Sequence, residues 1–161
     1  LRKLQTRSSE VKYNTFVDND KVFKTIRTFI EGREISEENI CIIHGDPVFT
    51  NVFNDIEKNI KLIDMRGMIG NKETIYGDPV YDLAKIYQSI AGYDCILNNT
   101  PVILNEALND KFFTFVKNKY NIGVNVIQKM TAYLLYTLIP LHDTDKSVRF
   151  FNLCKQILGI K

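Results

Sequence analysis

Cysteine is scarce in this sequence, and the positions of the cysteines fit no shared structural role. Cys41, Cys95 and Cys154 are odd in number and far apart in a chain of 161 residues. This spacing excludes a regular disulfide framework and a paired zinc motif. A reducing, cytoplasmic location is the simplest expectation.

An excess of charge of one sign is also lacking. The chain has 21 basic and 19 acidic residues, so its formal net charge is +2, and the two signs are mixed along the sequence. Domains that bind nucleic acid usually carry a basic block or stripe. We therefore expect no nucleic-acid partner.

Long hydrophobic runs are absent as well. The most apolar helix candidate runs from Val124 to Leu141 and is interrupted by Asn125, Gln128 and Lys129. A membrane-spanning helix needs about 20 mostly apolar residues, and no charged-then-apolar leader opens the sequence. We predict a buried helix here and no membrane span.

The apolar residues that are present suffice for one folded domain. Hydrophobic residues make up 45% of the 18.7 kDa chain, which is enough for a substantial core. No internal repeat, low-complexity tract or interdomain linker is evident. The sequence therefore predicts a single domain over residues 1–161.

Two helices are predicted from apolar spacing and end signals. The first has Asn19 or Asp20 as its predicted N-cap and ends at Gly32, and its apolar face consists of Val22, Phe23, Ile26, Phe29 and Ile30. The second has Asp78 as N-cap and Pro79 at its first position. Its apolar face consists of Val80, Leu83, Ala84, Tyr87 and Ala91.

Three further helices are predicted towards the carboxyl end, over residues 105–119, 124–140 and 145–158. The first of these carries the apolar stripe Leu108, Phe112, Phe115 and Val116, and the last ends at Gly159. The β-structure is small by comparison. Ile40 to Ile43 is predicted as a buried strand, and Val52-Phe53 and Ile60 to Ile63 as a hairpin. The expected fold class is α+β, mainly helical with a small β-hairpin.

Polar residues follow the predicted strands at the stretch IIHGDPVFTN. Asp46 follows the first strand, where a partly buried carboxylate can accept a proton from a hydroxyl. Asn51 comes five residues later, and Asp64 follows the hairpin. Amide and carboxylate oxygens suit Mg²⁺, which usually takes one or two carboxylates and completes its shell with water and phosphates. If the two loops converge at one sheet edge, Asn51 and Asp64 can hold a nucleotide-bound magnesium ion.

Each of these residues also has an ordinary structural explanation. Taken singly, Asp46 and Asn51 are turn formers, and Asp64 is a charge at the end of a strand. His44, beside apolar residues, is interpreted as a core histidine. The joint spacing favours a functional site: H-G-D, four residues, N, then a hairpin, then I-D, then G-D-P-x-Y-D-L-A.

The segments IIHGDPVFTN, IKLID and YGDPVYDLAKI resemble the carboxy-terminal lobe of the aminoglycoside phosphotransferase and choline kinase family, which is related to the protein kinases. The resemblance implies a kinase-like lobe with an amino-terminal linker and helix over residues 1–39. The catalytic and metal-binding loops would occupy residues 40–66, and a helical subdomain residues 78–161. It also implies ATP as phosphoryl donor, Mg²⁺ as cofactor and a small hydroxylated acceptor.

Site residues are carried over position by position. Asp46 would be the catalytic base, and Asn51 and Asp64 would hold magnesium on the nucleotide phosphates. His44 would pack beneath the loop. Asp82 would brace the loop by accepting its backbone N–H groups, a role compatible with favouring the positive end of its helix.

Departures from the kinase pattern narrow the resemblance. Asp64 is followed by Met65-Arg66-Gly67 instead of Phe-Gly, and Gly45 replaces the arginine of the protein-kinase catalytic loop. These differences favour a small-molecule kinase, and the pattern is most similar to kinase-like proteins associated with surface-polysaccharide biosynthesis. No glycine-rich loop, strand lysine or partner glutamate precedes Ile40, so the amino-terminal lobe is expected to be absent from this chain.

Two alternative functions stay open. One is a non-catalytic kinase-like binding or regulatory module. The other is a metal phosphohydrolase that uses His44, Asp46 and Asp64 as ligands, with only His142 as a further histidine.

The expected acceptor is neutral or anionic. From residue 124 onward the chain has the acidic residues Asp143 and Asp145 and the basic residues Lys129, Lys146, Arg149, Lys155 and Lys161. This balance favours a sugar or sugar-like precursor over a polycationic aminoglycoside. Tyr133 and Tyr136 can stack on a sugar or a choline-like cation, but their helical spacing favours core positions.

Overall fold

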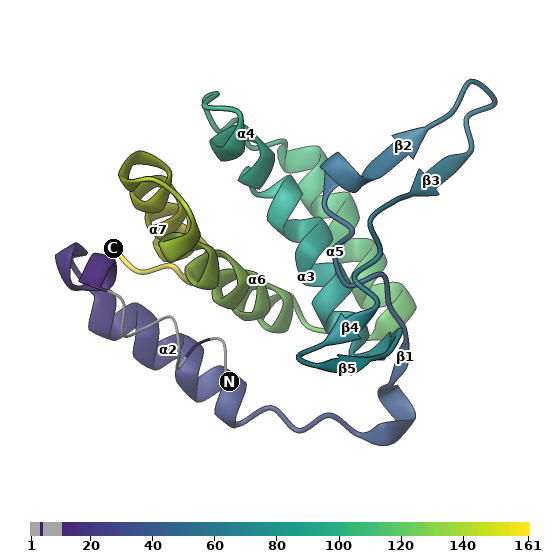
Figure 1. The fold of residues 1–161 in the computed structure, drawn as a ribbon, viewed down its shortest axis with the longest axis horizontal. Helices are drawn as coiled ribbons and strands as arrows, with labels where there is room; N and C mark the ends of the chain where they lie inside the picture. Colours follow the sequence, from purple (N-terminus) through teal and green to yellow (C-terminus); the bar gives the residue numbers. More distant parts are fainter. Residues whose placement is uncertain (1–3, 5–10) are drawn as a thin grey trace.

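The computed structural model describes Leu4 and residues 11–161, and its regular structure is mainly helical (Figure 1). The α-helices of the described residues are α2 (Asn19–Glu31), α3 (Pro79–Ile90), α4 (Tyr93–Leu97), α5 (Glu106–Tyr120), α6 (Val124–Leu138) and α7 (Thr144–Leu158). Short 3-10 turns are η1 (Val11–Thr15), η2 (Glu37–Asn39), η3 (Phe49–Asn51) and η4 (Ile139–Leu141). The predicted mainly helical α+β class is confirmed. The linker expected at the start of residues 1–39 lies mostly outside the described residues.

Helix α6 forms the centre of the core. It contacts α2, α3 and α7, and Figure 1 shows it between α3 and α7. Every residue from 131 to 137 is buried, as expected for a helix that is covered on all sides. The apolar segment at 124–141 is therefore a core helix, as the sequence predicts.

Tyr133 and Tyr136 are core residues in this helix. Tyr136 is 1% exposed, its hydroxyl donates to Asn19 Oδ1 at 2.8 Å, and its carbonyl accepts from the Tyr13 hydroxyl at 2.7 Å. Tyr133 is also buried. The prediction of core positions is confirmed for both.

No single helix among the described residues is both long enough and apolar enough to span a membrane. One pair of helical segments, 106–120 and 124–141, meets the length and composition test together, but the two are bent by 113° relative to each other.

Three antiparallel two-stranded ladders make up the β-structure of the described residues. They pair β1 (Cys41–Ile42) with β6 (Tyr76–Gly77), β2 (Val52–Asn54) with β3 (Ile60–Leu62), and β4 (Met68–Ile69) with β5 (Lys72–Glu73). The predicted hairpin is confirmed as β2–β3. In Figure 1 it projects away from the helices.

The predicted buried strand at residues 40–43 is wrong in its burial. Only Cys41 and Ile42 form a strand, and both are exposed. They pair with β6 alone, so their apolar side chains mark a surface instead of an interior.

Helix boundaries agree closely with the prediction except at the start of α2. The N-cap is Asp18 and not Asn19 or Asp20, and it has φ 67° with no capping bond from its side chain. Its carboxylate instead pairs with Lys155 Nζ on α7 at 2.5 Å. A long-range ion pair therefore replaces the local cap that the sequence suggests.

The predicted apolar stripe on α5 is only half correct. Phe112 and Val116 are buried, whereas Leu108 and Phe115 are exposed. Helix α5 packs on α3, where the rings of Tyr87 and Phe112 stack with centroids 5.7 Å apart. The contact with α3 therefore covers a narrower face of α5 than the apolar spacing of the sequence predicts.

Candidate active site

The loop at residues 44–51, between β1 and β2, holds the first two predicted site residues. Its start is buried, with His44 7% exposed. Gly45 has φ 83°, and a Cβ atom there would lie 2.7 Å from Cβ of Arg66. Glycine is required at this position because the conformation is left-handed and the neighbouring segment is close.

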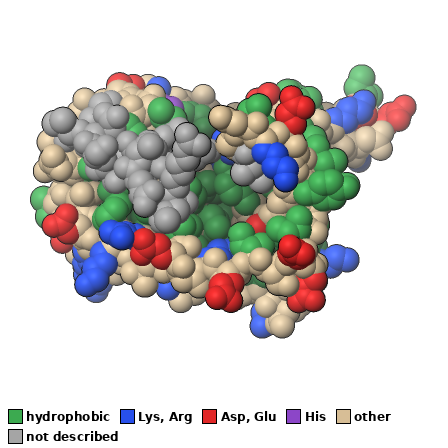
Figure 2. Space-filling model, turned by 60° about the horizontal axis from the view of Figure 1, so that its bottom comes forward, with side chains coloured by type: hydrophobic (Ala, Val, Ile, Leu, Met, Phe, Trp, Pro, Cys, Tyr) green, Lys and Arg blue, Asp and Glu red, His purple; other side chains and the backbone are tan. Residues whose placement is uncertain are grey.

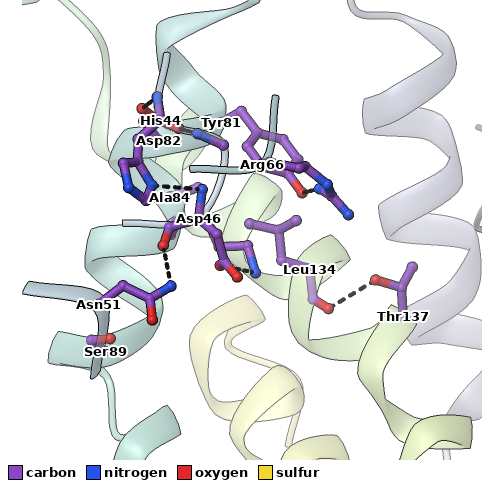
Figure 3. Close-up of polar contacts among 12 residues, drawn as sticks. His44, Asp46, Asn51, Arg66, Tyr81, Asp82, Ala84, Ser89, Leu134 and Thr137 are labelled. Carbon is purple, nitrogen blue, oxygen red and sulfur yellow. Dashed lines mark hydrogen bonds and ion pairs between the residues drawn. The ribbon is translucent and has the colours of Figure 1, made fainter. Parts of the chain in front are cut away.

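Asp82 on α3 holds the start of this loop. Its two carboxylate oxygens accept the backbone N–H groups of His44 at 2.7 Å and Gly45 at 2.8 Å, as Figure 3 shows. Burial raises the pKa of Asp82, while the two N–H donors oppose that shift. The structure thus contains the contacts that the family resemblance implies for this residue.

Asp46 follows with a partly accessible carboxylate. Its side chain is 37% exposed, and its Oδ1 lies 3.0 Å from Nζ of Lys85 on α3. Its backbone N–H donates to Nδ1 of His44 at 3.3 Å. Burial raises the pKa of nearby Tyr93 to about 12, and the negative charges of Asp46 and Asp94 add to this shift. The Tyr93 phenol therefore keeps its proton at neutral pH.

Asn51 ends the loop and is bonded back to its start. The Nδ2 group of Asn51 donates to the backbone carbonyl of Asp46 at 2.9 Å (Figure 3). Upstream, the N–H of Phe49 donates to Oγ of Ser89 at 2.9 Å. The bond from Nδ2 orients the amide of Asn51 and leaves its Oδ1 available as an oxygen ligand.

Asp64 lies on a neighbouring segment that runs along the loop. The N–H of Ile63 donates to the carbonyl of Asn51 at 3.0 Å, and the N–H of Arg66 donates to the carbonyl of His44 at 2.9 Å. The loops do converge, but not at a shared sheet edge as expected, because Asp46 follows the β1–β6 pair and Asp64 the β2–β3 pair.

The backbone of Asp64 is left-handed, a conformation that aspartate adopts more often than most other residues. Its φ is 60°, and its side chain is exposed. Non-glycine residues in the left-handed region are uncommon and are enriched at functional sites. Because Asp18, Lys58, Asn99 and Asn121 share this conformation, it does not by itself mark Asp64 as functional.

Apart from Asp82, which the sequence predicts, the site is contacted from α3 and from the segment after Asp64 by residues that no sequence pattern indicates. Lys85 and Ser89 were not singled out, although they follow Asp82 at helical spacings of three and seven residues. Arg66 also contacts the site, through the N–H that it donates to the His44 carbonyl. Its guanidinium bonds the Tyr81 hydroxyl at 2.5 Å and lies 5.9 Å from the centre of that ring.

No cluster of three or more His, Cys, Asp or Glu side chains that could hold a metal ion occurs in the part of the chain that the structure describes. Nδ1 of His44 accepts the N–H of Asp46. The available hard ligands near the loop are oxygens from Asn51 and Asp64, which fit magnesium better than a transition metal.

Comparisons with protein-family models, with curated proteins and with solved structures each gave no match.

Proposed function

We propose that this chain is the catalytic part of a small-molecule kinase that transfers the γ-phosphoryl group of ATP to a hydroxyl of its acceptor. The observation that carries the proposal is the bonded arrangement of the loop at 44–51. Asp82 holds its start, Asn51 closes it onto Asp46, and the segment before Asp64 bonds to Asn51. Three residues with the chemistry of phosphoryl transfer thus belong to one connected structure.

Asp46 has the role of proton acceptor in this proposal. Its carboxylate is partly exposed. Its backbone N–H donates to His44 and its backbone carbonyl accepts from Asn51, so an acceptor hydroxyl can approach a carboxylate that is held in place. The hydroxyl oxygen forms a bond to the γ-phosphorus while the bond to the bridging oxygen breaks. The hydroxyl proton passes to Asp46, and the electron pair of the broken bond stays on ADP.

Asn51 and Asp64 would hold magnesium. Oδ1 of Asn51 and the exposed carboxylate of Asp64 are hard oxygen donors, and two protein ligands suffice where phosphates and water complete the shell. Magnesium would neutralise charge on the nucleotide phosphates. The nucleotide phosphates would therefore bind beside Asn51 and Asp64.

The proposed acceptor is a neutral or anionic hydroxylated molecule such as a sugar or a polysaccharide precursor. The carboxy-terminal helices supply more basic than acidic residues, which disfavours a polycationic acceptor. Tyr133 and Tyr136 are both buried, so neither serves as an exposed platform for a choline-like cation.

Asp46→Asn in the full-length protein tests the proposed reaction. We expect turnover to fall roughly 10²–10⁴-fold, the usual contribution of a positioned base, with little change in nucleotide affinity and some loss of stability, because the buried ammonium group of Lys85 loses its counter-charge. The measurement is ATP-dependent phosphorylation across a panel of sugars, sugar phosphates, aminoglycosides and choline. The matched control is Asp110→Asn, which removes an exposed carboxylate on α5.

Two results would contradict the proposal. Near-normal turnover by Asp46→Asn would remove Asp46 from its role as base. Selective phosphorylation of aminoglycosides or choline, with sugars inert, would overturn the assignment of the acceptor.

A further inference from the structure

Lys85 places a positive charge in the interior beside the proposed base. The residue is 9% exposed, and its Nζ lies 3.0 Å from Oδ1 of Asp46. Lysine is rarely this buried unless it is paired. Because the Asp46 side chain is 37% exposed, the pair joins a buried cation to a carboxylate that solvent and substrate can reach.

The position of Lys85 on α3 explains this contact. Asp82, Lys85 and Ser89 lie on one face of the helix, three and then four residues apart. Asp82 accepts the N–H groups at the start of the loop, and Ser89 accepts the N–H of Phe49. Both of those contacts are to backbone atoms. Lys85 is the member of this face that reaches the reacting carboxylate itself.

Stability alone is a weak explanation for such a pair. The cost of removing a lysine ammonium from water offsets most of the attraction between the two charges, so ion pairs of this kind add little net stability. An apolar residue could pack at the same point of α3. The contact between Lys85 Nζ and Asp46 Oδ1, in contrast, directly fixes the direction in which the Asp46 carboxylate points.

We propose that Lys85 is a positioning residue that holds the Asp46 carboxylate oriented for the acceptor hydroxyl. This inference rests on the proposed phosphotransferase function. As Asp46 takes the hydroxyl proton and becomes neutral, the ammonium group loses its counter-charge close to the reacting centre. The summed charge of the Asp46 and Lys85 side chains then rises by one, and this positive charge stabilises the anionic phosphoester product.

The test compares the variants Lys85→Met, Lys85→Arg and Asp46→Asn of the full-length protein with the unsubstituted full-length protein, called the parent protein below. The assay contains magnesium, ATP and the acceptor panel described above. We expect Lys85→Met to lower kcat by about 100-fold, the scale on which a small misplacement of a catalytic group acts. KM for ATP should change less than about twofold, because the nucleotide ligands are untouched. Lys85→Arg keeps the charge and should recover part of the lost kcat.

Matched controls separate positioning from folding. Lys111→Met removes an exposed lysine on α5 and should leave kcat unchanged. Circular dichroism and thermal unfolding check that each variant is folded. If Lys85→Met does not fold, Lys85→Gln and Lys85→Arg give the same comparison of neutral with charged side chains.

The outcomes distinguish this inference from the proposed function. Loss of turnover in Asp46→Asn, with Lys85→Met as active as Lys111→Met, would overturn the role of Lys85 and leave the phosphotransferase intact. A Lys85→Met variant that changes KM for ATP as much as kcat would also overturn it. A parent protein no more active than Asp46→Asn on every acceptor would overturn the proposed function and this inference with it.

Discussion

Backbone conformation and hydrogen bonds to backbone groups hold individual residues at the site in place. Gly45 has no room for a Cβ atom, because Arg66 packs against it. Asp64 adopts a left-handed backbone conformation. Asp82 is partly buried with both carboxylate oxygens bonded to backbone N–H groups. At the scale of the residue, the loop is ordered by backbone contacts, and Asp46 is left with a partly exposed carboxylate.

Asp82 gives a pH dependence that can be measured. Burial raises its pKa above the usual 3.8, so the folded state binds this proton more tightly than the unfolded chain does. Its contribution to the free energy of unfolding is therefore complete below pH 3.8 and declines as the pH rises through the folded-state pKa. We expect the difference in unfolding free energy between the parent and Asp82→Asn to shrink from pH 3.8 towards neutral pH.

Urea unfolding of both proteins at a series of pH values checks this expectation, since other titrating groups cancel in the difference. The two N–H donors act in the opposite direction to burial. A difference that grows with pH would show that these hydrogen bonds outweigh the burial of the carboxylate.

Residue spacing was informative where the chemistry is local. The motif H-G-D-x-x-x-x-N identified Asp46 and Asn51, which the structure bonds to each other. Lys85 could not be found in this way, because its partner lies 39 positions earlier in the chain and only the packing of α3 on the loop brings them together.

At the scale of elements, α3 connects the core to the site. One side of it packs on α6, and Asp82, Lys85 and Ser89 contact the loop. Its start is fixed by Asp78, whose side chain accepts the N–H of Val80 at 2.9 Å and pairs with Arg33 at 2.7 Å. A shift of α3 would therefore move the contacts that Asp82, Lys85 and Ser89 make with the loop.

Asp78→Ala should destabilise the protein by about 2–4 kcal/mol. Loss of an N-cap costs about 1 kcal/mol, and Arg33, whose side chain is only 19% exposed, loses its ion-pair partner at a further cost typical of an unpaired charged group. The control is Asp143→Ala, which removes the N-cap of α7, an exposed bond to the N–H of Lys146. We expect a smaller loss there. Equal shifts of the urea midpoint in the two variants would contradict this account.

Elements were predictable where their signals are local. Capping residues, glycine stops and apolar spacing locate the five long helices to within a few residues. Helix α4 was missed because five residues are too few to show a period. The burial of residues 40–43 was wrong because an apolar β-branched run does not reveal whether another layer covers it.

At the scale of the whole molecule, apolar exposure is concentrated around the site. Large hydrophobic side chains are exposed on β1, on the β2–β3 hairpin and on the segment that follows Asp64, and they include Ile42, Phe53, Ile56, Ile60, Leu62, Ile63 and Met65. In Figure 2 hydrophobic side chains are visible on the projecting part of the molecule at the upper right. An exposed surface of this kind is typical of an interface or a binding groove. Within the proposed function, an amino-terminal lobe of the kinase type would cover this surface.

The hairpin tip provides the last prediction, because its apolar side chains contribute to this surface and not to the core. Ile56 is 102% exposed and Ile60 73% exposed. Ile56→Glu together with Ile60→Glu should change the free energy of unfolding by no more than about 0.5 kcal/mol per site, while lowering the binding of an apolar dye and any self-association in sedimentation experiments. Leu135→Ala, in the fully buried part of α6, should cost about 2–5 kcal/mol without reducing dye binding to the folded state. If the double variant unfolds as easily as Leu135→Ala, the hairpin is part of the core, and the surface around the site is not an interface.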